Sequence, residues 1–165
     1  MNLTLAILAG GRASRFGGRD KGQLVYQGRT LLDRLLDLRA VCEATLIVRD
    51  DVVPGRGTPG GVVTALLRAT TSYVLIVCCD MPFVTVEAVQ PLLEVNGPAV
   101  FGDEPFPGVY PTALGPVWRD RLVTNPSMRG LLASEPFARL ALKDPRVARS
   151  INTEADAKSH GVDIP

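Results

Sequence analysis

A glycine- and arginine-rich loop near the N-terminus is the stretch of the sequence best suited to binding an anion. It runs from Leu8 to Gly22 and contains two pairs of adjacent glycines. Glycines let backbone amides approach an anion closely, and Arg12, Arg15, Arg19 and Lys21 add charged donors. The pattern matches neither the G-x-G-x-x-G of dinucleotide folds nor the G-x-x-x-x-G-K-[ST] of phosphate-loop ATPases. We therefore expect a polyphosphate site of another kind, with a solvated surface loop as the alternative.

Asp80 is the second candidate for chemistry, because it ends an apolar run and is followed by Met81 and Pro82. A buried strand would bring this carboxylate to the same sheet edge as the loop. There a hard oxygen ligand could hold Mg²⁺ against phosphate oxygens. An isolated aspartate at a strand end is more often a helix cap or a turn former. Together with the loop, the metal role is favoured.

A third glycine-rich stretch, Gly57-Thr58-Pro59-Gly60-Gly61, allows two interpretations. Its small residues leave room for a flat base against the backbone, whose amides and carbonyls could read the edge of that base. The same residues are also typical of a plain helix start. The sequence alone does not separate these two roles.

Apolar runs and helical spacing indicate the elements that must position these residues. Strands buried on both faces are predicted at Leu3 to Ala9, Ala44 to Val48 and Tyr73 to Cys79. Helical spacing follows between them, after a Thr30 cap and again over residues 62–69. Alternation of strands and helices predicts an α/β fold, with ligands bound at the carboxyl ends of the strands.

The second half of the chain contains further expected elements. A helix should begin after Thr85, and Thr153 with Asp156 should form a capping box for the last helix. We also expect strands at 98–101 and 109–113, a surface loop at 102–108, and helices at 117–123, 128–133 and 136–142. No repeat, linker or low-complexity tract divides the chain, so residues 1–165 are expected to form one domain.

The composition excludes several classes of function. With 18 Lys and Arg against 17 Asp and Glu, the net charge of +1 offers no global field for a nucleic acid or an anionic membrane. Cys42, Cys78 and Cys79 are odd in number and are expected to be free thiols in a soluble, cytoplasmic protein. The single histidine, His160, is expected to be a surface or cap residue.

Three motifs together resemble the molybdenum cofactor guanylyltransferase (MobA-type) family of nucleotidyltransferases. They are Phe-Gly-Gly-Arg-Asp-Lys-Gly at 16–22, Cys-Asp-Met-Pro at 79–82 and Ile-Asn-Thr-Glu at 151–154, and the similarity spans almost the whole chain. The resemblance implies a three-layer Rossmann-like nucleotidyltransferase fold with a mostly parallel central sheet. It also implies transfer of GMP from GTP to the phosphate of molybdopterin, with Mg²⁺ as cofactor and pyrophosphate as the second product.

The resemblance also assigns roles to residues. It implies catalytic roles for Arg15, Lys21 and Asp80, and it places Asp80 and Asn152 at the metal. The nucleotide would be bound by Leu8, Ala9, Gly10, Gly11, Lys21, Asp51, Gly57 and Asp80. Asp50 is an alternative to Asp51, because the segment after the second strand is shorter than is typical and the usual asparagine there is replaced by Arg49.

On the acceptor side, the resemblance implies that Tyr110 and Pro111 line the pterin and that Arg129 meets its phosphate. GTP and molybdopterin are the expected partners, and transient contacts with cofactor delivery proteins or acceptor enzymes are compatible with this role. A nucleic acid or a membrane is not expected. The alternatives are a related cofactor or sugar nucleotidyltransferase using CTP or another nucleotide, and a non-catalytic nucleotide-binding cofactor chaperone.

Overall fold

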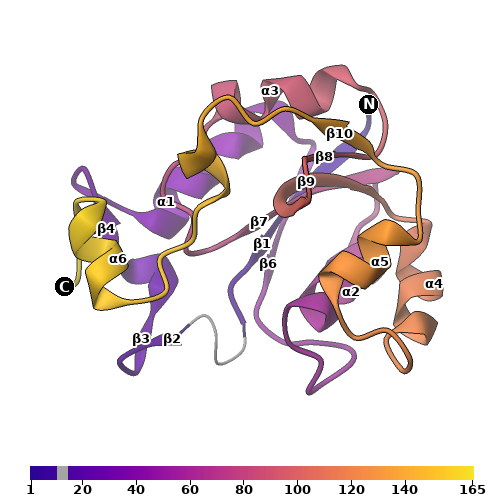
Figure 1. Ribbon diagram of the computed structural model, residues 1–165, viewed down its shortest axis with the longest axis horizontal. Coiled ribbons are helices and arrows are strands. Elements are labelled where there is room, and N and C mark those ends of the chain that lie inside the picture. Colours follow the sequence, from indigo (N-terminus) through magenta and orange to yellow (C-terminus); the bar gives the residue numbers. More distant parts are fainter. Residues whose placement is uncertain (11–14) are drawn as a thin grey trace.

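The computed structural model describes residues 1–10 and 15–165, and at Arg15 the backbone alone. A six-stranded sheet in the order β10-β8-β9-β7-β1-β6 forms its centre (Figure 1). Its middle contains the expected strands, β1 (Leu3–Leu8), β6 (Ala44–Val48) and β7 (Tyr73–Cys78). Three of the five strand pairings are parallel. The predicted α/β fold with a mostly parallel sheet is therefore confirmed.

The expectation that all three strands are buried on both faces holds for β1 and fails for β6. All six residues of β1 are buried, whereas Thr45 and Ile47 of β6 are exposed. The reason is topological, because β6 forms the edge of the sheet beside β1. One face of an edge strand can remain open to solvent while the other packs on the core.

Helices cover both faces of the sheet (Figure 1). The helix α1 (Leu31–Leu35), the 3-10 helix η3 (Leu36–Val41) and α3 (Val86–Glu94) pack on one face, and α2 (Gly57–Arg68) and α4 (Leu114–Arg121) pack on the other. The predicted caps are present, since the Thr30 hydroxyl accepts from the amide of Asp33 and the Thr85 hydroxyl from that of Ala88.

Two predictions in the second half of the chain are wrong. The expected surface loop at 102–108 belongs mostly to β9 (Glu104–Pro111), which runs antiparallel between β7 and β8 (Ala99–Phe101). Burial of Phe106, Val109 and Tyr110 in the core outweighs the turn character of the local prolines and glycines. The expected helix at 136–142 is instead the short strand β10 (Ala138–Leu140), which pairs in parallel with β8.

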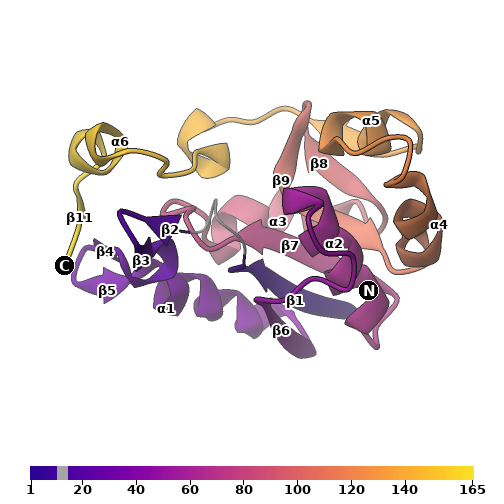
Figure 2. The same ribbon diagram turned by 90° about the horizontal axis from the view of Figure 1, so that it is seen from below.

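A smaller group of elements lies at the end of the molecule that carries the C-terminus (Figures 1 and 2). Its strands and helices come from the two ends of the chain. They are β2 (Arg15–Phe16), β3 (Arg19–Asp20), η2 (Lys21–Gln23), β4 (Val25–Tyr26), β5 (Arg29–Thr30), α6 (Glu154–Ser159) and β11 (Val162–Asp163). The Thr153 and Asp156 capping box of α6 is present as predicted, and His160 is its C-cap.

A second, smaller apolar cluster holds this end together. It contains Phe16, Leu24, Leu31, Ile151, Ala157 and Val162, all of them buried. Phe16 and Leu24 flank Lys21, and Ile151 directly precedes Asn152. The cluster therefore joins the N-terminal loop to a segment about 130 residues away in the sequence and fixes where Lys21 and Asn152 can meet.

The remaining elements are α5 (Met128–Ala133), which agrees with its prediction, and the 3-10 helix η4 (Pro145–Ala148). None of the helices in the described part of the chain combines the length and the apolar composition of a membrane span. Cys42, Cys78 and Cys79 are free, as expected.

Candidate active site

A cavity of about 780 Å³ opens at the carboxyl ends of β1, β6 and β7. Open α/β sheets bind ligands at this edge. Its walls come from five different parts of the chain. They are formed by Leu8, Gly10, Val48, Asp51, Gly55, Gly57, Thr58, Gly61, Cys78, Cys79, Asp80, Phe106, Ser150 and Asn152. Six of the residues that the sequence proposed for the nucleotide or the metal thus share one cavity: Leu8, Gly10, Asp51, Gly57, Asp80 and Asn152.

Gly10 lets β1 and the segment after β6 approach each other closely at the cavity wall. A Cβ atom at this position would lie 2.2 Å from the carbonyl oxygen of Arg49. No side chain can be accommodated at that distance without moving the backbone. The amide of Ala9, the preceding residue, donates to the carbonyl of Val48 at 2.8 Å. The strand ends therefore form a bare backbone wall against which a ligand can lie.

Asp51 lies against the first turn of α2 in the cavity wall. Cβ atoms on Gly60 and Gly61 would lie 3.3 and 3.7 Å from its carboxylate oxygens, so larger side chains there would crowd this group. The pKa of Asp51 is raised, mainly by burial, while Arg68 lowers it and Asp50 raises it. Asp51 lines the cavity and Asp50 does not, which favours Asp51 of the two acidic candidates.

The most polar part of the site is a contact between Lys21, Asp80 and Asn152. The Lys21 ammonium donates to Asp80 Oδ2 at 2.9 Å and to Asn152 Oδ1 at 3.1 Å. The side chains of Lys21 and Asp80 are only 4% and 11% exposed. The other carboxylate oxygen, Asp80 Oδ1, is buried and has no hydrogen-bond partner among the described residues. A buried acceptor without a partner is costly, and it marks a place where a ligand would be stabilised.

Local structure before Lys21 sets the position of its ammonium group. Strands β2 and β3 form a hairpin whose two turn residues, Gly17 and Gly18, both have positive φ. Asp20 then caps η2 by accepting from the amide of Gly22 at 2.8 Å. Arg49 donates to the other oxygen of Asp20 at 3.0 Å. The lysine-bearing turn is thus tied to the end of β6.

The polypeptide around Asn152 is anchored on the strand end that carries Asp80. The amide of Ile151 donates to the carbonyl of Asp80 at 2.9 Å, and the amide of Asn152 donates to Asp156 Oδ2 at 3.0 Å. Asn152 itself is exposed. Its amide oxygen therefore contacts the Lys21 ammonium together with Asp80, and a ligand can still reach it.

The donor set at this point fits a magnesium ion that is shared with phosphates. Mg²⁺ is commonly held by one or two carboxylates, with waters and substrate phosphates completing its shell. The buried, unpartnered Asp80 Oδ1 and the neighbouring Asn152 Oδ1 offer two hard oxygens. No cluster of three or more His, Cys, Asp or Glu occurs within residues 1–10 and 15–165, so the described residues offer no all-protein metal cage.

Several predicted site residues lie elsewhere or outside the described part of the chain. Gly11 and the side chain of Arg15 fall outside it, and Ala9 is buried next to the cavity. The acceptor-side prediction for Tyr110 and Pro111 is wrong. Tyr110 is buried in the core against Trp118. Pro111 pairs with Tyr73 at the start of β7, whereas Asp80 follows the other end of that strand.

Arg129 is exposed on α5 and is not among the residues that line the cavity. Its expected contact with an acceptor phosphate therefore has no support from the geometry. Sequence reasoning also missed Phe106 and Ser150 in the cavity wall. Ser150 stands two residues before Asn152, so the 151–154 motif could have drawn attention to it. Phe106 gave no such signal, because its segment was expected to be a loop.

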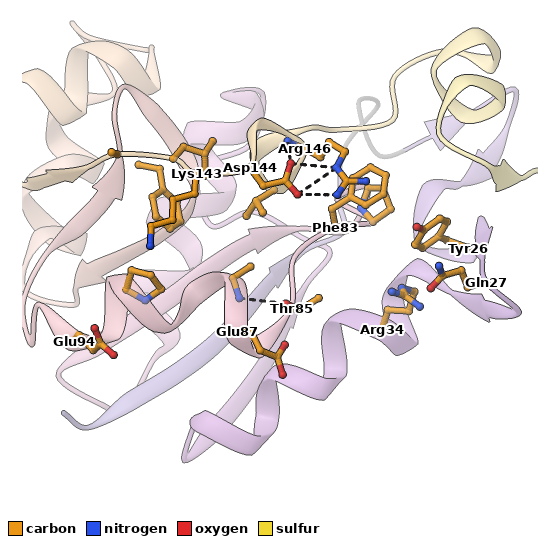
Figure 3. A pocket seen from close by; sticks show the side chains of 17 residues that line it. Tyr26, Gln27, Arg34, Phe83, Thr85, Glu87, Glu94, Lys143, Asp144 and Arg146 are labelled. Atoms are coloured by element: carbon orange, nitrogen blue, oxygen red, sulfur yellow. Dashed lines mark hydrogen bonds and ion pairs between the residues drawn. The ribbon is translucent and has the colours of Figure 1, made fainter.

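A second cavity of about 670 Å³ lies over α3 (Figure 3). Three of the six charged side chains that line it are paired or stacked. Arg146 contacts Asp144 at 2.9 Å and lies 5.2 Å from the centre of the Phe83 ring, and Arg34 lies 4.7 Å from that of Tyr26. None of the residues predicted for the site lines this cavity.

The known proteins that are similar to this chain include nucleotidyltransferases, which agrees with the geometry of the cavity at the strand ends. Residues 5–136 match the model of the MobA-like NTP transferase domain. The chain is 33% identical to a probable molybdenum cofactor guanylyltransferase of Deinococcus radiodurans, over 80% of this chain and 74% of that protein.

Two solved structures share the fold at low sequence identity. Molybdopterin-guanine dinucleotide biosynthesis protein A from Archaeoglobus fulgidus superposes with a TM-score of 0.70 at 19% identity, covering 95% of this chain and 96% of that one. For 2-C-methyl-D-erythritol 4-phosphate cytidylyltransferase from Thermus thermophilus the TM-score is 0.71 at 17% identity, with 97% of each chain covered. These likenesses establish the nucleotidyltransferase fold. The match over residues 5–136 and the 33% identity to the Deinococcus protein show that the chain belongs to the MobA-like NTP transferase family.

Proposed function

We propose that this chain is a Mg²⁺-dependent guanylyltransferase that joins GMP from GTP to the phosphate of molybdopterin and releases pyrophosphate. The observation that carries the proposal is the hydrogen-bonded cluster of Lys21, Asp80 and Asn152. It lies beside the cavity at the strand ends, where Gly10 exposes the backbone. The similarity to a probable molybdenum cofactor guanylyltransferase supports the choice of nucleotide and acceptor.

In this proposal the triphosphate lies over the carboxyl end of β1, with its charge facing Lys21. Mg²⁺, held by Asp80 and Asn152, would neutralise charge on the α-phosphate and on the departing pyrophosphate. The turn that Asp20 caps fixes the backbone of Lys21 at this end of the site, so its ammonium group can reach the phosphates once they bind. Positive charge placed against the phosphates is among the largest contributions that a protein makes to phosphoryl transfer.

The proposed base site is the part of the cavity that is lined by Asp51 and the start of α2. Guanine carries two adjacent donors on one edge, N1–H and the N2 amine, and a carboxylate can accept from both. Asp51 is half-buried and its pKa is raised by burial, so donors from a ligand would stabilise its charged form. Gly57, Thr58 and Gly61 leave space for a flat ring at this end of the cavity.

No protein nucleophile is needed for this reaction. The acceptor phosphate is already anionic at neutral pH, so alignment and charge neutralisation suffice. The two thiols in the cavity wall would be poor nucleophiles, because burial raises the pKa of Cys79 to about 12 and that of Cys78 well above its ordinary value. Direct transfer from the nucleotide to the acceptor phosphate is therefore the favoured course.

A nucleotide panel tests the proposal. GTP, ATP, CTP and UTP are each supplied with Mg²⁺ and molybdopterin, and pyrophosphate release is measured with and without the acceptor. We expect release with GTP that depends on both the acceptor and the metal. Turnover with CTP alone would make the chain a cytidylyltransferase, and absence of turnover with every nucleotide would indicate a nucleotide-binding protein without transferase activity.

A further inference from the structure

The Lys21 ammonium stands where a metal ion would be expected. It contacts Asp80 Oδ2 at 2.9 Å and Asn152 Oδ1 at 3.1 Å, and these two residues are the proposed metal ligands. Lys21 is 3% exposed, which is rare for a lysine and requires a partner of opposite charge. The protein thus places its own cation between the oxygens that would otherwise attract Mg²⁺.

The charges in this part of the site balance without any metal. The carboxylate of Asp80 is one buried negative charge, and the Lys21 ammonium is one buried positive charge directly against it. Asp20, which lies next to Lys21 in the sequence, is already paired with Arg49 at 3.0 Å and caps η2. A divalent ion arriving at Asp80 would therefore bring excess positive charge, unless Lys21 moved or a further anion arrived with the metal.

We propose that Lys21 is an internal counter-ion of Asp80 that competes with the metal and gives way to it only when a triphosphate offers the ammonium new partners. This inference rests on the proposed function for the identity of the nucleotide, but the competition itself concerns only this chain and a divalent cation. It makes metal binding weak before the nucleotide binds and strong afterwards. A metal–nucleotide complex would then bind in preference to either component alone.

The surrounding structure allows this exchange. The backbone of Lys21 is fixed by the Asp20 cap and by the flanking residues Phe16 and Leu24 of the smaller apolar cluster. The lysine side chain has a flexible four-carbon stem, so its charge can shift by a few ångströms while the backbone stays in place. Asp80 keeps one oxygen, Oδ1, unpartnered among the described residues, and that oxygen can receive the metal first.

Thermal unfolding with Mn²⁺ as the probe, and without nucleotide, tests the competition. In Lys21→Met the carboxylate of Asp80 loses its counter-ion, so we expect a lower Tm that rises by about 3 °C or more when Mn²⁺ is added. The wild type should show no comparable rise. By electron paramagnetic resonance of free Mn²⁺, the variant should bind the ion at least about tenfold more tightly.

Three variants serve as controls. Lys143→Met removes an exposed lysine beside the second cavity and should respond to Mn²⁺ as the wild type does. Lys21→Met combined with Asp80→Asn removes both charges and should lose the Mn²⁺ response. Lys21→Gln keeps a donor for Asp80 without a charge, and it provides the same test if Lys21→Met does not fold.

An equal Mn²⁺ response in the wild type and in the Lys21 variants would overturn the proposal, as would a response that persists in the double variant or is absent from every variant. The measurement uses neither nucleotide nor acceptor. Failure of the nucleotide panel would therefore leave the competition between Lys21 and the metal testable, and loss of the competition would leave the proposed transfer reaction open.

Discussion

The two cavities are similar in size but differ in how their charges are satisfied. The cavity at the strand ends measures about 780 Å³ and the one over α3 about 670 Å³. Asp80 in the wall of the first cavity pairs with Lys21, and their side chains are 11% and 4% exposed. In the second cavity the side chains of Arg146 and Asp144 are 60% and 43% exposed. Exposed pairs of this kind contribute little. The candidate active site is therefore distinguished by its buried ion pair and by the exposed backbone near Gly10, and not by the volume of its cavity.

The largest difference between the cavities should appear when one carboxylate in each is neutralised. Asp80→Asn keeps an acceptor for Lys21 but removes the charge that would hold the metal, so we expect GMP transfer to fall by about 10³-fold. Asp144→Asn should leave the rate within about twofold, since its pair with Arg146 is solvated. Initial rates of pyrophosphate release at saturating GTP measure both effects.

Circular dichroism spectra of the two variants control for unfolding. If Asp80→Asn were folded and retained near-normal turnover, the metal role of Asp80 would be wrong. If Asp144→Asn abolished turnover, the second cavity would have to take part in the reaction.

A smaller effect is expected from filling the backbone wall of the first cavity. In Gly10→Ala the new Cβ would meet the carbonyl oxygen of Arg49 at 2.2 Å, so the ends of β1 and β6 must separate. We expect a loss of about 1–3 kcal/mol in the free energy of unfolding and a weaker affinity for GTP. Urea denaturation and equilibrium binding measure the two consequences.

Gly97→Ala is the matched control, because a Cβ there would meet nothing within 4 Å and φ at this position is not positive. Its stability should change by less than about 0.5 kcal/mol. Equal destabilisation by the two substitutions would show that the close approach of Gly10 to Arg49 is not required at this position.

The smallest expected effect concerns the choice of base within the first cavity. Asp51→Asn leaves one acceptor for the guanine edge in place of two, so kcat/KM for GTP should fall by about 10–100-fold. The preference for GTP over ITP, whose base lacks the N2 amine, should shrink in parallel. Asp50→Asn, at the neighbouring residue outside the cavity, should change neither quantity. An unchanged GTP to ITP ratio in Asp51→Asn would remove Asp51 from the base site.

Local signals were sufficient for the central parallel strands and for the helix caps. The apolar runs at β1, β6 and β7 and the caps at Thr30, Thr85 and Thr153 agree with the structure, because each depends on neighbouring residues only. The sequence also predicted that Asp80 lies at the same end of the sheet as the glycine-rich loop, because each follows a buried strand. These features need no knowledge of distant pairing.

The features that sequence reasoning missed depend on contacts between distant segments. Strand β9 contains Pro105, Pro107 and Gly108, which are unfavourable in isolated strands, and it forms only because β7 and β8 pair with it on both sides. The expected loop at 102–108 is why Phe106 was missed as a residue of the cavity wall. The contact of Lys21 with Asn152 likewise depends on the second apolar cluster, which no local pattern indicates.

A crystal structure of the protein with Mg²⁺ and a non-hydrolysable GTP analogue would locate the base, the triphosphate and the metal in one experiment. We expect the guanine to lie against Asp51 and the start of α2, with the triphosphate beside Lys21 and the metal on Asp80. A nucleotide bound instead in the second cavity, stacked between Phe83 and Arg146 over α3, would contradict it.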